Sequence, residues 1–70
     1  MTTRERYEQL RDAHHLTDYE VMRQAGVEKS TFYSWRQRSE NDPDLSMTVP
    51  NMVKIAQVFD VSLDYLVGRG

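Results

Sequence analysis

Residues 16–35, LTDYEVMRQAGVEKSTFYSW, are the part of this chain that decides its fold. Thr17 and Glu20 have the spacing of a capping box, in which each side chain satisfies an unpaired N–H group at a helix start. Apolar residues then follow at helical spacing, so we predict a short helix over residues 18–25. Gly26 suits the left-handed backbone conformation that ends a helix.

A second helix follows this turn and begins at about Lys29. It places Phe32 and Trp35 one turn apart on one face, while its opposite face is small and polar. Two short helices joined by a glycine turn, the second with a polar outer face, form a helix-turn-helix, here over about residues 17–37. The second helix of such a unit can enter the major groove of DNA.

The remaining sequence predicts three further helices. The first covers about residues 3–14, and a strongly amphipathic one covers residues 49–59 behind a Thr48 N-cap. A short last helix starts after Ser62. Residues 38–47, RSENDPDLSM, have the composition of a loop. We therefore expect an all-α, compact five-helix domain that takes up the whole chain.

Composition excludes several classes of protein. The chain has 70 residues and no cysteine, which excludes disulfides and thiolate metal sites. His14 and His15 are adjacent, so they point to different sides of a helix and do not form a metal pair. Without a nucleophile–base arrangement or a glycine-rich phosphate loop, we expect no enzyme activity, no cofactor and no metal. No apolar run reaches about 18 residues and no signal peptide is visible, so we expect a cytoplasmic protein without membrane spans.

The net charge of −2 argues against a general nucleic-acid binder, which is usually basic. The charges are unevenly distributed, however. Three carboxylates are crowded into residues 40–44, whereas residues 29–38 hold three cations and no acid. A basic face on an acidic protein can still dock on phosphate groups, with weaker long-range steering.

Two segments, LTDYEVMRQAGVEKSTFYSW and TVPNMVKIAQVFDVSLDYLVG, resemble the Cro/C1-type helix-turn-helix regulators, the lambda-repressor-like or XRE-type family. The resemblance spans Tyr7 to Val67. It implies a lambda-repressor-like DNA-binding domain and a sequence-specific transcriptional regulator, a repressor of the kind that bacteria, phages and mobile elements encode. It further implies double-stranded DNA as the partner, a palindromic operator, and a homodimer at least on DNA.

The resemblance also assigns contact residues. Its base-reading positions fall on Lys29, Ser30 and Ser34, with Tyr33 as a neighbour, although an ordinary solvated helix face is the alternative. The expected DNA-contacting set is Thr17, Asp18, Lys29, Ser30, Thr31, Tyr33, Ser34, Arg36, Gln37 and Arg38.

This sequence departs from the family pattern at two positions. Asp18 stands where the family commonly has a glutamine that holds a phosphate, and a carboxylate there would repel DNA. Arg36 stands where the family often has a glutamate paired with an arginine at the position of Arg11. That ion pair cannot form here, so we expect Arg36 to be available for DNA, or the two cations simply to avoid each other.

Tyr65, Leu66 and Val67 in the last helix are the expected dimer interface, since a small core can leave apolar surface for a second copy. Residues 67–70 look like the start of a linker, so the domain could belong to a longer regulator. Two rivals remain. One is a protein-interaction module that keeps the fold without binding DNA, which Asp18 and the acidic balance favour. The other is an antitoxin, which usually needs an extra toxin-binding segment.

Overall fold

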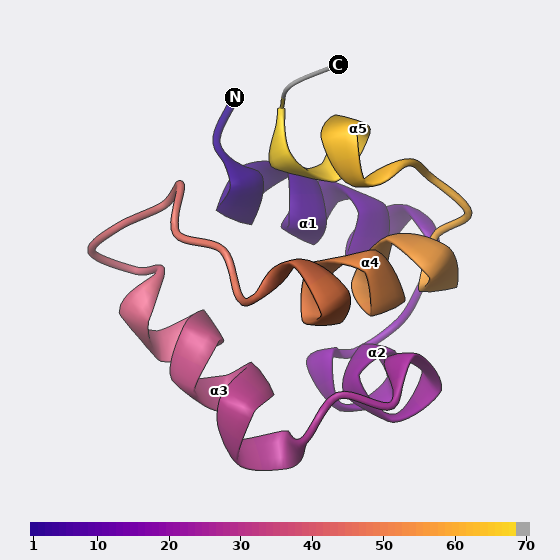
Figure 1. The fold of residues 1–70 in the computed structure, drawn as a ribbon. Coiled ribbons are helices and arrows are strands. Elements are labelled where there is room, and N and C mark those ends of the chain that lie inside the picture. The colour runs from indigo at the N-terminus through magenta and orange to yellow at the C-terminus, as the bar shows by residue number, and fades with distance from the viewer. Residues whose placement is uncertain (69–70) are drawn as a thin grey trace.

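The computed structural model describes residues 1–68, and within them it contains five helices and no strand. The helices are α1 (Thr3–Ala13), α2 (Asp18–Ala25), α3 (Lys29–Arg38), α4 (Val49–Val58) and α5 (Leu63–Val67). Figure 1 shows α1, α4 and α5 grouped together, with α2 and α3 on the other side of α4 and both termini at the same end. The predicted all-α, five-helix fold is confirmed.

The helix-turn-helix forms for the local reasons that its sequence suggests. The hydroxyl of Thr17 accepts from the backbone N–H of Glu20, whose carboxylate accepts from the N–H of Thr17 at 3.0 Å. Gly26 ends α2 with φ +73°, in the left-handed region that favours glycine. Val27 follows as a buried residue and anchors the turn in the core.

The other helix ends are capped in different ways. Thr2 and Glu5 form a second capping box at the start of α1, in addition to the one predicted at Thr17. Thr48 takes the predicted N-cap place of α4, but its side chain makes no capping hydrogen bond. Ser62 caps α5 as predicted, and Gly68 ends it in the left-handed conformation. The expected linker continues into residues 69–70, which lie outside the described part of the chain.

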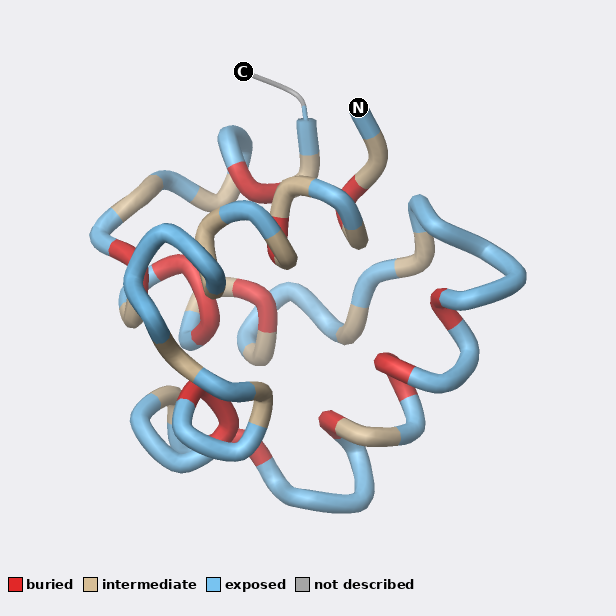
Figure 2. Tube along the Cα trace, turned by 180° about the vertical axis from the view of Figure 1, so that it is seen from behind, coloured by how far each residue is buried: buried red, intermediate tan, exposed pale blue. Residues whose placement is uncertain are grey.

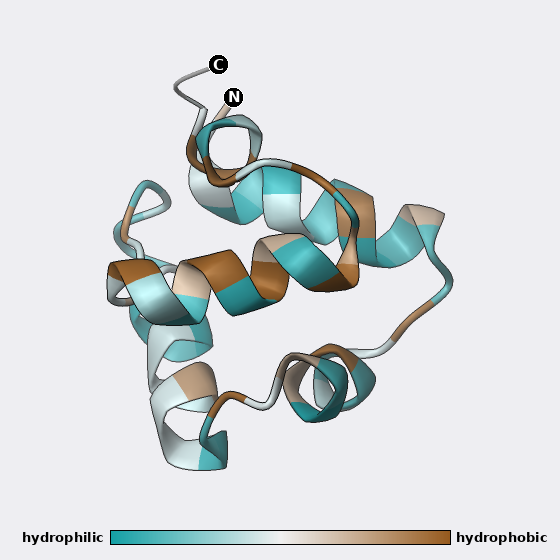
Figure 3. Ribbon diagram, turned by 45° about the vertical axis from the view of Figure 1, so that its right-hand side comes forward, coloured by the Kyte–Doolittle hydropathy of each residue, from teal (hydrophilic) through white to brown (hydrophobic). Residues whose placement is uncertain are grey.

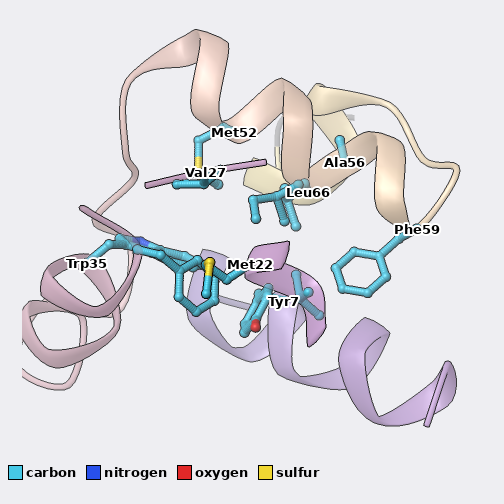
Figure 4. Packing of buried hydrophobic residues seen from close by; sticks show 11 residues of the cluster. Tyr7, Met22, Val27, Trp35, Met52, Ala56, Phe59 and Leu66 are labelled. Atoms are coloured by element: carbon cyan, nitrogen blue, oxygen red, sulfur yellow. The ribbon is translucent and has the colours of Figure 1, made fainter. Parts of the chain in front are cut away.

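Aromatic rings form the centre of the core. The Tyr7 ring meets Phe32, Trp35 and Phe59 edge to face, with ring centroids 5.1 to 6.1 Å apart. Met52 and Leu66 fill the space between α4, α5 and these rings (Figure 4). Figure 3 shows that α4 carries more hydrophobic residues than α3, whose residues are mostly hydrophilic or intermediate in hydropathy. Aromatic side chains from α1, from α3 and from the C-cap of α4 therefore join these three helices in the core.

Burial divides α3 into two faces. Its buried positions recur about once per turn on the side that faces the domain, and the other side is open to solvent (Figure 2). Phe32 and Trp35 are at most 3% exposed, which is the burial expected from their spacing. The opposite face of α3 is therefore available to a partner.

We predict that Gly26→Ala lowers the free energy of unfolding by about 1 kcal/mol, because an L side chain is disfavoured at this positive φ. A Cβ there would meet nothing within 4 Å, so the cost comes from backbone conformation alone. Gly26→Asn should cost less, since asparagine tolerates the left-handed region. Urea unfolding measures the free energy of unfolding of both variants. A Gly26→Ala variant as stable as the wild type would contradict the account of the turn.

Candidate nucleic-acid interface

The outer face of α3 is polar and exposed. The residues of α3 whose side chains lie open to solvent are Lys29, Ser30, Thr31, Ser34, Gln37 and Arg38. Tyr33 differs from the expectation of an outward side chain, because it is only partly exposed and its ring packs edge-on against Phe32 at 5.3 Å. The polar outer face predicted from helical spacing is thus present, with Tyr33 at its rim.

A groove of about 420 Å³ runs along this face. Ser30, Ser34 and Arg38 line its α3 side, and the other side is lined by Leu45, Ser46, Met47, Thr48 and Asn51. The indole N–H of Trp35 donates to the carbonyl oxygen of Leu45 at 2.7 Å, which ties the loop after α3 to the helix. The loop and the start of α4 therefore form the opposite wall of the groove, in which apolar side chains stand among the polar ones.

Arg36 is not part of the outer face, and the expectation that it is available for DNA is wrong. Its side chain is only 10% exposed. The Nη2 group donates to Glu8 at 2.8 Å and Nε donates to Asp18 at 3.3 Å, while the guanidinium lies 4.9 Å from the centre of the Tyr7 ring. Two carboxylates and an aromatic ring hold it against the domain, so it cannot also reach a phosphate.

The carboxylate of Asp18 also points into the domain. It accepts from the hydroxyl of Tyr7 at 2.7 Å and from the guanidinium of Arg11 at 2.8 Å, as well as from Arg36. Burial alone would raise the pKa of Asp18, but the hydrogen bonds from Arg11 and Tyr7 and the charges of Arg36 and Arg11 outweigh it and lower the pKa. The two cations expected to avoid each other instead share one carboxylate.

Arg4 connects α1 to the C-terminal end of α3. Its Nη1 group donates to the carbonyl oxygen of Arg36 at 2.7 Å and to the hydroxyl of Ser39, which is fully buried, at 2.6 Å. Its Nε also lies 3.5 Å from Glu8. The resulting ion-pair network, defined from here on by its five charged members, consists of Arg4, Glu8, Arg11, Asp18 and Arg36.

This network leaves few cations for a partner. Within residues 1–68, the exposed basic side chains outside any ion pair are Arg23, Lys29, Arg38 and Lys54. On α3 that leaves one cation at each end of the helix, with small hydroxyl residues between them. A partner therefore meets hydrogen-bonding groups along most of this face and charge only at its ends.

Glu28, which is not among the predicted contact residues, places a carboxylate at the start of α3. It takes the N-cap position without a side-chain hydrogen bond to the helix backbone. It is exposed, and it accepts from the Ser30 hydroxyl at 2.5 Å. The sequence signal for it is a carboxylate directly before the basic start of a helix.

The last helix corrects the expected dimer interface. Leu66 is fully buried in the core and cannot contact a second copy. Tyr65 is 46% exposed with the guanidinium of Arg6 4.5 Å from its ring centre, and Val67 is partly exposed beside a pocket of about 130 Å³. Of the three expected residues, only these two present surface.

Within residues 1–68, no group of three or more His, Cys, Asp or Glu side chains is placed to hold a metal ion. No helix in this part of the chain has the length and apolar character needed to cross a membrane.

Comparison with known proteins gives one informative relative. The chain is 33% identical over 64 residues to an uncharacterized HTH-type transcriptional regulator, YobD, from Bacillus subtilis (strain 168). The match covers 91% of this chain but 53% of the relative, so the chain spans about half the length of the curated protein it matches. No family model and no solved structure gives a match. Similarity and geometry together support a helix-turn-helix regulator.

We predict that Arg36→Met lowers the free energy of unfolding by about 2 kcal/mol. Methionine keeps apolar contact with Tyr7 but removes a cation from two carboxylates that are only 28% and 32% exposed. Arg38→Met, at an exposed position, is the matched control and should change stability by less than about 0.5 kcal/mol. Equal effects of the two substitutions in urea unfolding would show that Arg36 is solvated.

We also predict that acid destabilises the domain partly through Asp18. Because its folded pKa lies below its usual value of 3.8, its contribution is present above about pH 4 and is lost as pH falls through the lowered pKa. Asp18→Asn should reduce stability at neutral pH by about 1 kcal/mol. It should also flatten the loss of stability below pH 4, as measured by urea midpoints over a pH series. An unchanged acid slope in the variant would contradict this assignment.

Proposed function

We propose that this domain is a sequence-specific DNA-binding unit of a Cro/C1-type transcriptional regulator, and that α3 enters the major groove. The observation that carries the proposal is the exposed, hydrogen-bonding outer face of α3 on a helix-turn-helix whose inner face is locked into the core. Such a helix presents side chains to base edges near its N-terminus. The similarity to an HTH-type transcriptional regulator supports the same conclusion.

In this proposal the side chains of α3 divide into two roles. Lys29 and Ser34 contact base edges, since lysine donates to guanine and serine to several bases. Arg38 contacts the phosphate backbone beside the groove, where hydroxyl and amide groups of Ser46 and Asn51 add hydrogen bonds. The domain does no chemistry and acts by occupying its site, as a cytoplasmic repressor does.

Pairing of two copies completes the proposal. Two domains related by a two-fold axis would read the halves of a palindromic operator. Tyr65 and Val67 are the residues of α5 that present surface for such a contact, now without Leu66. The contact would form at least on DNA.

A protein-interaction module with this fold is the second candidate. The burial of Arg36 in the ion-pair network favours this second candidate. Only two exposed cations then remain on α3, next to a carboxylate and on a chain of net charge −2. Such a domain would use the same groove for a peptide segment. A DNA-binding measurement separates the two candidates.

We predict that a duplex selected from random fragments binds in the micromolar range or tighter at about 50 mM salt, with affinity that falls as salt rises. Arg38→Ala should weaken all sequences alike and reduce the salt slope by about one, since it removes a phosphate contact. Ser34→Ala should change preference at one base pair by about 1 kcal/mol and leave the slope unchanged. If no fragment binds under these conditions, the interaction module is the better account.

A further inference from the structure

Glu28 is the least expected feature of the candidate interface. It stands directly before α3, and its carboxylate is exposed rather than bonded to the helix backbone. A shallow, open depression of about 560 Å³ lies beside it, lined by Glu28, Lys29, Ser30 and Tyr33. There is therefore room for the edge of a base against this carboxylate.

A group that only accepts hydrogen bonds discriminates between the four bases in the major groove. An ionised carboxylate accepts hydrogen bonds and donates none. Guanine and thymine present acceptors there, so a carboxylate repels them. Adenine presents a donor next to the N7 acceptor, whereas cytosine presents its N4 amino group as a donor. Of the four bases, cytosine therefore suits a carboxylate best.

Ser30 orients this carboxylate. Its hydroxyl donates to one oxygen of Glu28 at 2.5 Å, which leaves the second oxygen for another donor. Because its single proton is used in this way, Ser30 cannot at the same time donate to guanine or thymine. Ser30 thus acts as a positioning residue for Glu28 rather than as an independent reader of sequence.

We propose that Glu28 is a specificity-determining residue that accepts a hydrogen bond from the N4 amino group of one cytosine in each half-site. This inference rests on the proposed DNA-binding function and adds a base preference to it. Without such a donor the carboxylate would only repel the phosphate backbone, at the end of α3 where Lys29 provides the attraction.

The test is selection of binding sites from a random duplex library by the wild type, Glu28→Gln and Glu28→Ala. The wild type should prefer cytosine at one position of the half-site by about tenfold, within the range of one good side-chain–base contact. Glu28→Gln should select adenine at that position, since glutamine pairs with adenine N6 and N7. Glu28→Ala should show no preference there.

Glu40→Gln is the matched control. It removes an exposed carboxylate from the loop after α3 and should leave the cytosine preference intact. Thermal unfolding checks that each variant is folded, and no capping hydrogen bond is lost at Glu28 because none is present. Ser30→Ala should weaken the cytosine preference at the same position, which is the effect expected of a positioning residue.

The outcomes separate this inference from the function on which it rests. If the wild type selects a motif and both Glu28 variants select the same one, the inference is overturned while DNA binding stands. If both variants only tighten binding to every sequence, Glu28 is a repulsive charge and the inference is again overturned. If the wild type selects no motif, the proposed function itself fails.

Discussion

The ion pair between Arg36 and Asp18 joins α3 to the start of α2, and the geometry of the candidate interface depends on it. Figure 1 shows α3 at the edge of the domain, so side chains rather than close backbone packing fix its orientation. Phe32 and Trp35 supply the apolar half of that attachment through Tyr7. The ion pair fixes the orientation of α3, because hydrogen bonds at defined distances tolerate less rotation of the helix than apolar contacts do. A partly buried ion pair is a weak source of net stability, and its value here is in orienting the helix.

The same network explains how an acidic domain can present a hydrogen-bonding face. Three arginines and two carboxylates are used internally, which removes most of the basic charge near α3 from contact with a partner. If the domain binds DNA as proposed, attraction to phosphate is modest and limited to a few contacts. Selectivity then comes from hydrogen bonds along α3. A domain of this kind would bind non-specific DNA weakly. Weak non-specific binding favours discrimination between sequences.

The sequence predicted the elements whose causes are local. The capping residues Thr17 and Glu20, the turn at Gly26 and the apolar spacing of α4 each act within a few positions, so the pattern is sufficient. The ion pairs of Arg36 were not predictable in this way. Its partners lie 18 and 28 positions away, and only the folded chain shows that they meet.

Two further differences have separate causes. The expectation of a dimer contact near this end of the chain assigned Leu66 to a surface that it does not reach, because in the folded chain its side chain is used to fill the core. The family pattern directed attention to Asp18 as a phosphate neighbour, although its hydrogen bonds to Tyr7 and Arg11 give it a role inside the fold. Resemblance suggested where a DNA interface would lie, and the structure showed that Asp18 and Arg36 are paired inside the fold.

The central claim is that the outer face of α3 is the surface that meets DNA. An NMR titration of the ¹⁵N-labelled domain with a selected duplex tests it most directly, because each backbone amide reports its own surroundings. We expect the largest shift changes at residues 28–38 and in the loop up to Asn51, further changes at Tyr65 and Val67 where two copies pair on the DNA, and small changes on the far side of α4. Changes concentrated in α1 with residues 28–38 unaffected, or no saturable change with any duplex, would contradict the account.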